Sequence, residues 1–547
     1  MEEFVENDEF YDWLRNAVDL DIYVGCEVPN FEDLREYLYY EIPIDRSTYH
    51  AGRKKEFLKT ALINLWVAFQ NGIPLMYSRD KNRYTKANRY GKLFFTHRNV
   101  TEIYDALESM GFVHQKIGFY DKGKFMTRVY PSGKLIELFL YTFTGLPGEV
   151  EKTLRDEVIV LKTEKTVKRK TKKGRIKIQK TKPVLDYQDD ERSIIMRMRV
   201  EEYNEFIRKQ DIRFEVPGEL PIKFSSWLYI MTGLIKGTIR LISYEVNDEE
   251  KAIKMHGLIS KINEISDVHD AYGESDILKV RYPVTGTKEY EIKVYDFVFN
   301  HLLSMHKKLS RKYNKNGRRK IPFVLSDFGI SKMVIEAKYE DLYRVFNKGV
   351  FDMGGRFYGA YHLSLDKNIR KYHTLINGNR TVELDYSALH PRMCYHKIGE
   401  DYRKDPYWAA CKSDCEAERK MFKKVQLAVI NAENVAQAVK GIRHDFYKRK
   451  EKYDIEDVKD QTILELIDRF KDAHRPIENF LMSGAGLHLQ SLDSTITDNI
   501  LWYFLNKGIP VLPVHDSYII EECYKGLLEE KMVEFYEILM GFPPVIG

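Results

Sequence analysis

Two aspartates in the C-terminal part of the chain follow apolar runs that favour β-strands. Asp385 ends such a run in RTVELDYSALHPRM, directly before a helix-like stretch, and Asp516 stands at the tip of a hairpin between PVLPV and YIIEE. An aspartate that stands alone after a strand is commonly a helix cap, so the prediction depends on the pair. Both carboxylates can face one side of a sheet, where they could share metal ions.

Paired carboxylates of this kind suit phosphoryl transfer onto a 3′-hydroxyl. That reaction uses two Mg²⁺ ions about 3.5–4 Å apart, one activating the attacking oxygen and one holding the triphosphate and its leaving group. Because Mg²⁺ keeps several waters and binds phosphate oxygens, two protein carboxylates are enough, and Mn²⁺ could replace it. The sequence therefore predicts that Asp385 and Asp516 are catalytic metal ligands.

A basic helix pattern lies between the two aspartates. In ERKMFKKVQLAVINAENVAQAV, Arg419 and Lys423 are four residues apart and share one helix face, with Lys424 as an alternative to Lys423. A basic pair on a helix is usually only solvated. This pair stands out because it lies between the two aspartates in the sequence.

Four short segments follow one another in the order DMGGRFY (352–358), LDYS (384–387), LQSLDS (489–494) and VHDSY (514–518). The first resembles the Asp-x-x-Gly-Arg-x-Tyr segment of phage-type single-subunit RNA polymerases. The others resemble motif A, the helix before motif C, and motif C of those enzymes and of family-A DNA polymerases. The residues after motif A, LHP (389–391), resemble family-B DNA polymerases instead.

The resemblance implies a template-directed nucleic-acid polymerase, a nucleotidyltransferase with two Mg²⁺ ions that extends a 3′-hydroxyl. Its partners would be a template, a primer or product strand, and nucleoside triphosphates, with no expectation for protein partners. Asp385 and Asp516 would hold the metal ions, Arg419 and Lys423 the triphosphate, and His515 would support the primer end or orient Asp516. The nucleotide site would also include Tyr386, Ser387, His390, Lys424 and Asn431, and the path of template and product would include Gly355, Arg356, Tyr358, His474, Arg475 and Gln490.

His390 occupies the position that selects the sugar in these families. Family-A DNA polymerases have a glutamate there, single-subunit RNA polymerases have a small residue, and family-B enzymes have an aromatic gate. An imidazole is large enough to obstruct a 2′-hydroxyl, although its nitrogens could also bind one. Asn431, where the family has tyrosine, does not decide the matter. We expect DNA synthesis, with an RNA polymerase or primase as the alternative.

Two other classes of protein stay open. A replication initiator whose palm-like part has lost catalysis would bind DNA without incorporating nucleotides. A template-independent nucleotidyltransferase would keep the chemistry and extend ends without copying a template.

Two regions outside these motifs predict contact with nucleic acid. Residues 162–182 carry eleven basic residues and one acid around a Lys-Gly turn, which predicts a basic β-hairpin suited to a phosphate backbone, unless it is only a solvated loop. Residues 306–320 are similarly basic. A helix that opens after Thr96 and ends at Gly111, followed by a hairpin, has the order of a winged helix, with Lys122, Lys124 and Arg128 on the wing. The alternative is an ordinary α+β domain with a solvated basic hairpin. The predicted hairpin contacts in the first region are Lys168, Arg169, Lys170, Lys172, Lys173 and Arg175.

Composition indicates several packed units in an intracellular protein. The chain has 547 residues, 44% of them hydrophobic, and a net charge of only +5, so affinity for nucleic acid depends on where the basic residues lie. Five scattered cysteines favour a reducing, cytoplasmic setting, and no apolar run approaches the ~20 residues that span a membrane. The expected fold is α+β, a right hand with a winged-helix-like N-terminal domain at 1–150, a basic hairpin and helical thumb-like region at 151–340, and a palm at 341–547 with fingers inserted at about 398–480.

Overall fold

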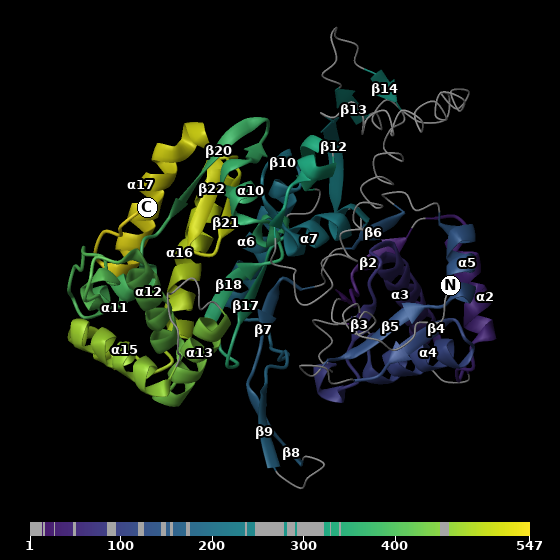
Figure 1. The fold of residues 1–547 in the computed structure, drawn as a ribbon, viewed down its shortest axis with the longest axis horizontal. Coiled ribbons are helices and arrows are strands. Elements are labelled where there is room, and N and C mark those ends of the chain that lie inside the picture. Colours follow the sequence, from purple (N-terminus) through teal and green to yellow (C-terminus); the bar gives the residue numbers. More distant parts are fainter. Residues whose placement is uncertain are drawn as a thin grey trace. The chain divides into compact units, whose positions relative to one another are not determined.

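The computed structural model divides the chain into two compact units. Unit 1 comprises Met1–Glu157, Arg208–Asp341 and Ala360–Arg380, and unit 2 comprises Val158–Ile207, Leu342–Gly359 and Thr381–Gly547 (Figure 1). Both units mix helices and strands and both are discontinuous in sequence, whereas the sequence predicted three consecutive regions. The structure describes residues 14, 17–26, 28–46, 51–84, 94–118, 125–143, 149–153, 157–170, 176–235, 238–246, 278–281, 290–292, 322–328, 330–337, 341–448 and 459–547.

The N-terminal part of unit 1 is a small sheet packed with helices. Its strand order is β1 (Val18–Asp19), β3 (Leu75–Tyr77), β5 (Thr127–Pro131) and β4 (Val113–Lys116), and β2 (Val24–Cys26) pairs separately with β6 (Val150–Lys152). The central helix α3 is almost wholly buried because apolar residues occupy most of its length. The helices are α2 (Phe31–Glu41), α3 (Ala51–Gln70), α4 (His97–Ser109) and α5 (Gly133–Thr142).

The helix and hairpin that suggested a winged helix are present. Thr96 caps α4 by accepting the amide N–H of Asn99, and β4 pairs antiparallel with β5. Lys122 and Lys124 lie outside the described residues. Arg128 is only 3% exposed and donates to the carbonyl of Leu14, so the expectation that it lies on a wing was wrong.

The rest of unit 1 contains a second row of strands, β14 (Tyr290–Ile292), β13 (Leu278–Arg281), β12 (Ile239–Val246), β16 (Ile330–Ala337), β10 (Ile212–Pro217) and β19 (Thr374–Ile376). The neighbouring α7 (Phe224–Ile235) packs on β12, β11 (Ile222–Lys223) pairs with β15 (Pro322–Phe323), and α10 (Lys367–Tyr372) precedes β19. The sequence predicted a helical region within 151–340, and these strands show that this was wrong for many of the residues described there. The buried side chains of β10 alternate with half-buried ones, which is the period of a strand. Residues 306–320 lie outside the described part.

Unit 2 holds the strands and helices of the polymerase-like motifs (Figure 1). Strand β20 (Asn379–Asp385) pairs antiparallel with β22 (Ser517–Glu521), which pairs antiparallel with β21 (Val511–Val514). The long helix α16 (Gly486–Asn506) precedes β21 and packs against α17 (Lys525–Met540), which follows β22. Helix α11 (Leu389–Lys397) follows β20, and α12 (Glu416–Asn431), α13 (Val435–Lys448) and α15 (Asp460–Ala473) form a helical group before α16.

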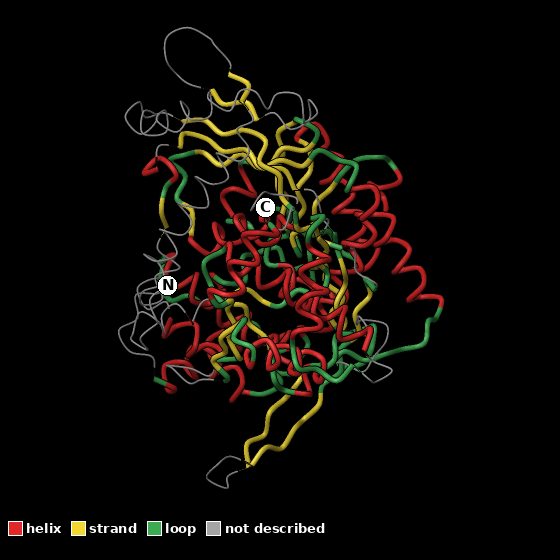
Figure 2. Tube along the Cα trace, turned by 90° about the vertical axis from the view of Figure 1, so that its right-hand side faces the viewer, coloured by secondary structure: helices red, strands yellow, loops and turns green. Residues whose placement is uncertain are grey.

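A second sheet of unit 2 lies against α16. It has the order β7 (Ile159–Leu161), β17 (Tyr343–Phe346) and β18 (Gly354–Tyr358), with β18 and α6 (Glu191–Ile207) both in contact with α16. The predicted basic hairpin is confirmed as the antiparallel pair β8 (Lys165–Lys170) and β9 (Ile176–Thr181). This ribbon projects away from the rest of unit 2 in both views (Figures 1 and 2). Of its predicted contacts, Lys172, Lys173 and Arg175 lie outside the described residues.

Two further predictions concern composition. The five cysteines are free in the structure. Within the described part of the chain, no helix is both long and apolar enough to cross a membrane.

Candidate active site

Asp385 and Asp516 lie side by side at one end of the sheet formed by β20, β22 and β21. In the pairing of β20 with β22, Asp385 is opposite Ser517, the residue that follows Asp516. The amide N–H of Tyr386 donates to the backbone carbonyl of Asp516 over 3.2 Å. Asp385 is exposed and Asp516 is half-buried. The structure therefore brings together the two carboxylate-bearing residues that the sequence singled out.

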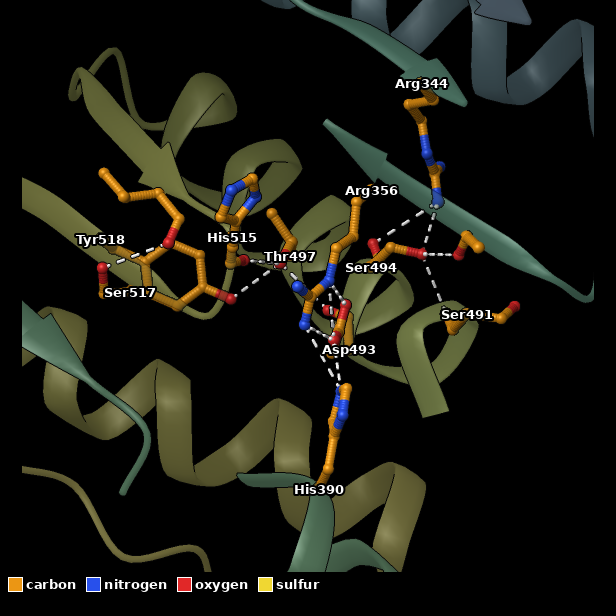
Figure 3. A network of polar contacts seen from close by, with 12 residues as sticks. Arg344, Arg356, His390, Ser491, Asp493, Ser494, Thr497, His515, Ser517 and Tyr518 are labelled. Atoms are coloured by element: carbon orange, nitrogen blue, oxygen red, sulfur yellow. Dashed lines mark hydrogen bonds and ion pairs between the residues drawn. The ribbon is translucent and has the colours of Figure 1, made fainter. Parts of the chain in front are cut away.

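Asp516 stands in a tight turn with a strained backbone. Val514 pairs with Ser517, so only His515 and Asp516 connect β21 to β22. His515 has a φ of 62°, in the left-handed region that costs a residue with a Cβ about 1–2 kcal/mol. The hydroxyl of Thr497 on α16 lies 3.3 Å from the carbonyl oxygen of His515 and 2.9 Å from the Tyr518 hydroxyl (Figure 3). These contacts with a long buried helix hold the turn in place.

Asp385 is held by backbone hydrogen bonds to the last residues of the sequence. The N–H of Gly547 donates to the carbonyl of Asp385, and the N–H of Ser387 donates to the carbonyl of Val545, both over 2.8 Å. Ala388, which precedes α11, has a φ of 49°. This short pairing cannot be recognised in the sequence, because three residues without a periodic pattern carry no strand signal.

Tyr386 belongs to the core rather than to a nucleotide site. It is 3% exposed, and its hydroxyl donates to the carbonyl of Met532 over 2.6 Å. Burial raises the pKa of Tyr386 well above its usual range. Neighbouring side chains of a strand face opposite sides, so the residue after the exposed Asp385 points into the interior. The expectation that Tyr386 binds the nucleotide was wrong.

A buried aspartate joins three of the motif segments (Figure 3). Asp493 of α16 is 2% exposed, and Arg356 of β18 donates to it through Nε over 3.1 Å and also through its terminal NH₂ group. Nε2 of His390, in the first turn of α11, lies 2.9 Å from the same carboxylate. Burial disfavours the charged form of Arg356, but the attraction of Asp493 outweighs the effect of burial. Asp516 adds to this attraction, so the pKa of Arg356 is raised. Asp493 lies inside the LQSLDS segment, where no sequence pattern distinguishes it from an ordinary polar residue of a helix.

The glycine directly before Arg356, Gly355, is explained by the packing of β18 against β17 and α16. Gly354 and Gly355 have φ values of 84° and 86°. A Cβ on Gly355 would lie 2.6 Å from Cε1 of Phe346 and 2.8 Å from Oγ of Ser494. The motif resemblance placed Gly355 on the path of template and product. Packing inside the protein is enough to require glycine at position 355. The predicted contact of Gly355 with nucleic acid is not needed to explain why this residue is a glycine.

Arg419 and Lys423 lie on one face of α12, over the ring of Tyr407. The Arg419 guanidinium carbon is 5.5 Å and the Lys423 Nζ is 5.8 Å from the ring centroid. Burial raises the pKa of Tyr407 to about 12, and the nearby charges of Asp405 and Asp516 add to the increase. Tyr407 therefore lies beneath the basic pair and within electrostatic range of Asp516. An aromatic residue in an irregular loop gives no periodic signal, so the sequence did not single out Tyr407.

Arg419 already has an acidic partner. Its terminal nitrogen donates to Asp405 over 2.7 Å. Burial of the Asp405 carboxyl favours a higher pKa, but the Arg419 guanidinium and two backbone N–H groups outweigh burial and lower the pKa of Asp405. Lys423 is exposed on the same face. A triphosphate would therefore meet Lys423 directly and would compete with Asp405 for Arg419.

His474 does not line a path for nucleic acid. It is completely buried, with Nε2 2.7 Å from the carbonyl oxygen of Pro406 and Nδ1 2.8 Å from the hydroxyl of Tyr395. A carbonyl can only accept, so Nε2 carries the proton and Nδ1 accepts from Tyr395. The expectation that His474 lines the path of template and product was wrong. A histidine between a helix and a proline looks exposed in the sequence, but here it is packed in the core.

The other predicted residues lie around these groups. Arg475 is exposed and pairs with Asp472 over 3.1 Å. The amide of Asn431 donates to the carbonyl of Leu427 in its own helix over 2.7 Å. Tyr358 is 37% exposed, with its ring 6.0 Å from that of His515. Lys424 and Gln490 are half-buried on α12 and α16.

The two aspartates of the sheet suit Mg²⁺ better than a softer metal. They offer only carboxylate oxygens, and one of them is exposed. Within the described residues, no group of three or more His, Cys, Asp or Glu side chains is arranged to hold a metal ion. The protein would supply two carboxylates, and water and phosphate oxygens would complete the coordination of Mg²⁺.

Comparison of the chain with protein-family models and with curated protein sequences finds no match in either case. A functional assignment therefore rests on the residues and their geometry.

Proposed function

We propose that this chain is a template-directed polymerase that extends a 3′-hydroxyl by two-metal phosphoryl transfer. The observation that carries the proposal is the register of β20 with β22, which sets Asp385 beside the turn of Asp516. In the right hand that we propose, β20, β21 and β22 with α16 and α17 form the palm. Helices α12, α13 and α15 form the fingers.

The residues around the aspartates have the chemistry that this reaction needs. When bound, two Mg²⁺ ions would activate the 3′-hydroxyl and neutralise the leaving pyrophosphate. Asp385 and Asp516 would hold them, each from a backbone position fixed by hydrogen bonds to neighbouring segments. Lys423 would attract the triphosphate, and Arg419 would join it as its bond to Asp405 is exchanged for one to phosphate.

The nucleic acid would lie along surfaces that carry the remaining motif residues. Tyr358 of β18 has its ring 6.0 Å from that of His515, and Gln490 belongs to α16. The ribbon of β8 and β9, with Lys168, Arg169 and Lys170 on its first strand, would bind the phosphate backbone. Deoxynucleoside triphosphates are the substrates that we favour, because the bulky His390 stands at the sugar position of motif A.

A primer-extension assay tests the proposal. The full chain is incubated with Mg²⁺, a labelled primer on a defined DNA template, and either deoxy- or ribonucleoside triphosphates. We expect products that copy the template and a preference for deoxynucleotides. Binding without any incorporation would instead identify a replication initiator, and products unrelated to the template would identify an end-extending transferase.

Variants of the two aspartates test the metal assignment. Asp385→Asn and Asp516→Asn should each reduce incorporation by more than tenfold while leaving primer–template binding intact, because each removes one metal ligand and no basic residue. Asp414→Asn is the matched control, since this aspartate is exposed in the loop before α12. Activity above about a tenth of wild type in either variant, a loss of under ~1.4 kcal/mol of barrier, would contradict the assignment.

A further inference from the structure

Asp493 is the shared hydrogen-bond acceptor of two motif residues. It is 2% exposed, whereas the side chains of Arg356 and His390 are 18% and 11% exposed. A buried carboxylate is costly unless hydrogen-bonded donors surround it, and here Arg356 and His390 are those donors (Figure 3). Loss of either contact would leave part of the buried charge uncompensated.

The contacts of Asp493 fix which nitrogen of His390 carries a proton. Nε2 of His390 faces the Asp493 carboxylate at 2.9 Å and an Arg356 terminal nitrogen at 3.4 Å. A carboxylate accepts and a guanidinium only donates, so the contact with Asp493 is a hydrogen bond only if Nε2 bears a proton. The imidazole ring is thus held at its Nε2 edge by a charge-assisted hydrogen bond.

This network is connected to both candidate metal ligands. His390 lies five residues after Asp385, in the first turn of the helix that follows β20. The hydroxyl of Thr497 lies 3.0 Å from the carbonyl oxygen of Asp493 and 3.3 Å from that of His515, the neighbour of Asp516. Helix α16 therefore anchors the imidazole and the motif C turn to one rigid support.

We propose that Asp493 is a positioning residue for sugar selection: it holds the His390 ring against the nucleotide sugar so that the ring cannot turn aside for a 2′-hydroxyl. This inference rests on the proposed polymerase function. An unsupported imidazole could rotate about its side-chain bonds and admit a ribonucleotide. A ring tied to a buried carboxylate can do so only by breaking that bond, so discrimination depends on Asp493 as well as on the bulk of His390.

Single-nucleotide incorporation measures this directly. For each variant, kcat/KM is determined for a deoxynucleotide and for the ribonucleotide of the same base, and their ratio is compared with wild type. His390→Ala and Asp493→Asn should each lower the ratio by at least tenfold. In the double variant, Asp493→Asn should cause no further decrease, because no ring remains to be positioned.

A second variant separates the ring from its bond and leaves Asp493 unchanged. His390→Phe keeps an aromatic ring but removes the donor to Asp493, while Arg356 still pairs with the carboxylate. We expect the ratio to fall as it does in Asp493→Asn. This variant decides the question if Asp493→Asn does not fold, as judged by circular dichroism and thermal unfolding.

Failure of the inference can be told from failure of the proposed function. If the wild type incorporates neither kind of nucleotide, the polymerase proposal fails and takes the inference with it. If the wild type extends primers but His390→Phe and any folded Asp493→Asn keep the wild-type ratio within twofold, only the inference fails. A further decrease caused by Asp493→Asn in the His390→Ala background, or a wild-type preference for ribonucleotides that His390→Ala weakens, would also overturn it.

Discussion

Replacement of Gly355 by alanine distinguishes a glycine needed for internal packing from one needed for contact with a ligand. The new Cβ would lie 2.6 Å from Cε1 of Phe346 and 2.8 Å from Oγ of Ser494, distances that require one element to move. Relief is difficult, because Arg344 is 3% exposed and its Nε donates to the carbonyl of Gly355 over 2.9 Å. The φ of 86° is unfavourable for alanine in any case.

The expected loss of stability follows from these two terms. A left-handed conformation costs an alanine about 1–2 kcal/mol. Overpacking of a well-filled interior costs about 1–3 kcal/mol. Gly355→Ala should therefore lower the free energy of unfolding by about 2–5 kcal/mol.

Urea and thermal unfolding of the full chain measure this loss. Gly441→Ala is the matched control, because Gly441 lies inside α13 and its Cβ would be 4.0 Å from that of Ala428. Alanine there should stabilise the helix by about 0.5–1 kcal/mol. If Gly355→Ala unfolds like wild type and loses only nucleic-acid binding, the packing argument is refuted and the glycine serves a ligand.

Three further outcomes are expected. Lys423→Ala should raise KM for the nucleotide at least tenfold without weakening primer–template binding. The control is Lys420→Ala on the same helix, which should change neither KM nor binding, because Lys420 is 49% exposed and follows Arg419 by one residue. Neutralising residues 168–170 should make the slope of log affinity against log salt shallower by roughly 0.7–0.9 per lost phosphate contact, and an unchanged slope would mean that the ribbon does not bind the backbone. Burial lowers the pKa of His474, so as the pH falls the unfolded chain binds a proton on this residue before the folded chain does. The stabilising contribution of the neutral His474 is therefore complete above about pH 6.5 and falls by up to ~1.4 kcal/mol per pH unit below it. Urea unfolding of His474→Gln should show a flatter pH dependence than that of wild type.

Local patterns predicted the elements next to the candidate metal ligands. An apolar β-branched run predicted the strand that ends at Asp385, and two short apolar runs around His-Asp predicted the hairpin of Asp516. Their pairing followed from the requirement that both carboxylates meet, and the register of β20 with β22 confirms it. The cap at Thr96 and the basic hairpin at 165–181 were predicted for similar reasons, since both are signals within a few residues.

Features that depend on contacts between distant segments could not be read from the sequence. Asp493 looked like one polar residue on a helix, and only the approach of β18 and α11 turns it into a shared acceptor. Tyr386 was expected at the nucleotide because it belongs to the motif A segment LDYS, although strand alternation sends it into the core. The strands of unit 1 between 212 and 337 pair with partners far along the chain, so their short apolar runs were mistaken for helix.

The positions of backbone strain indicate that the site is arranged before any substrate binds. Within the described residues, His515 and Ala388 are among the few non-glycine residues with positive φ, and each lies within three residues of a candidate metal ligand. Strain of this kind persists only where the surroundings determine the conformation. The surroundings here are Thr497 at one turn and the carbonyl of Val545 beside the other. In the polymerase that we propose, carboxylates on backbone positions fixed in this way would need little reorganisation as charge develops on the reacting phosphate, which is the condition under which fixed charges lower a barrier most.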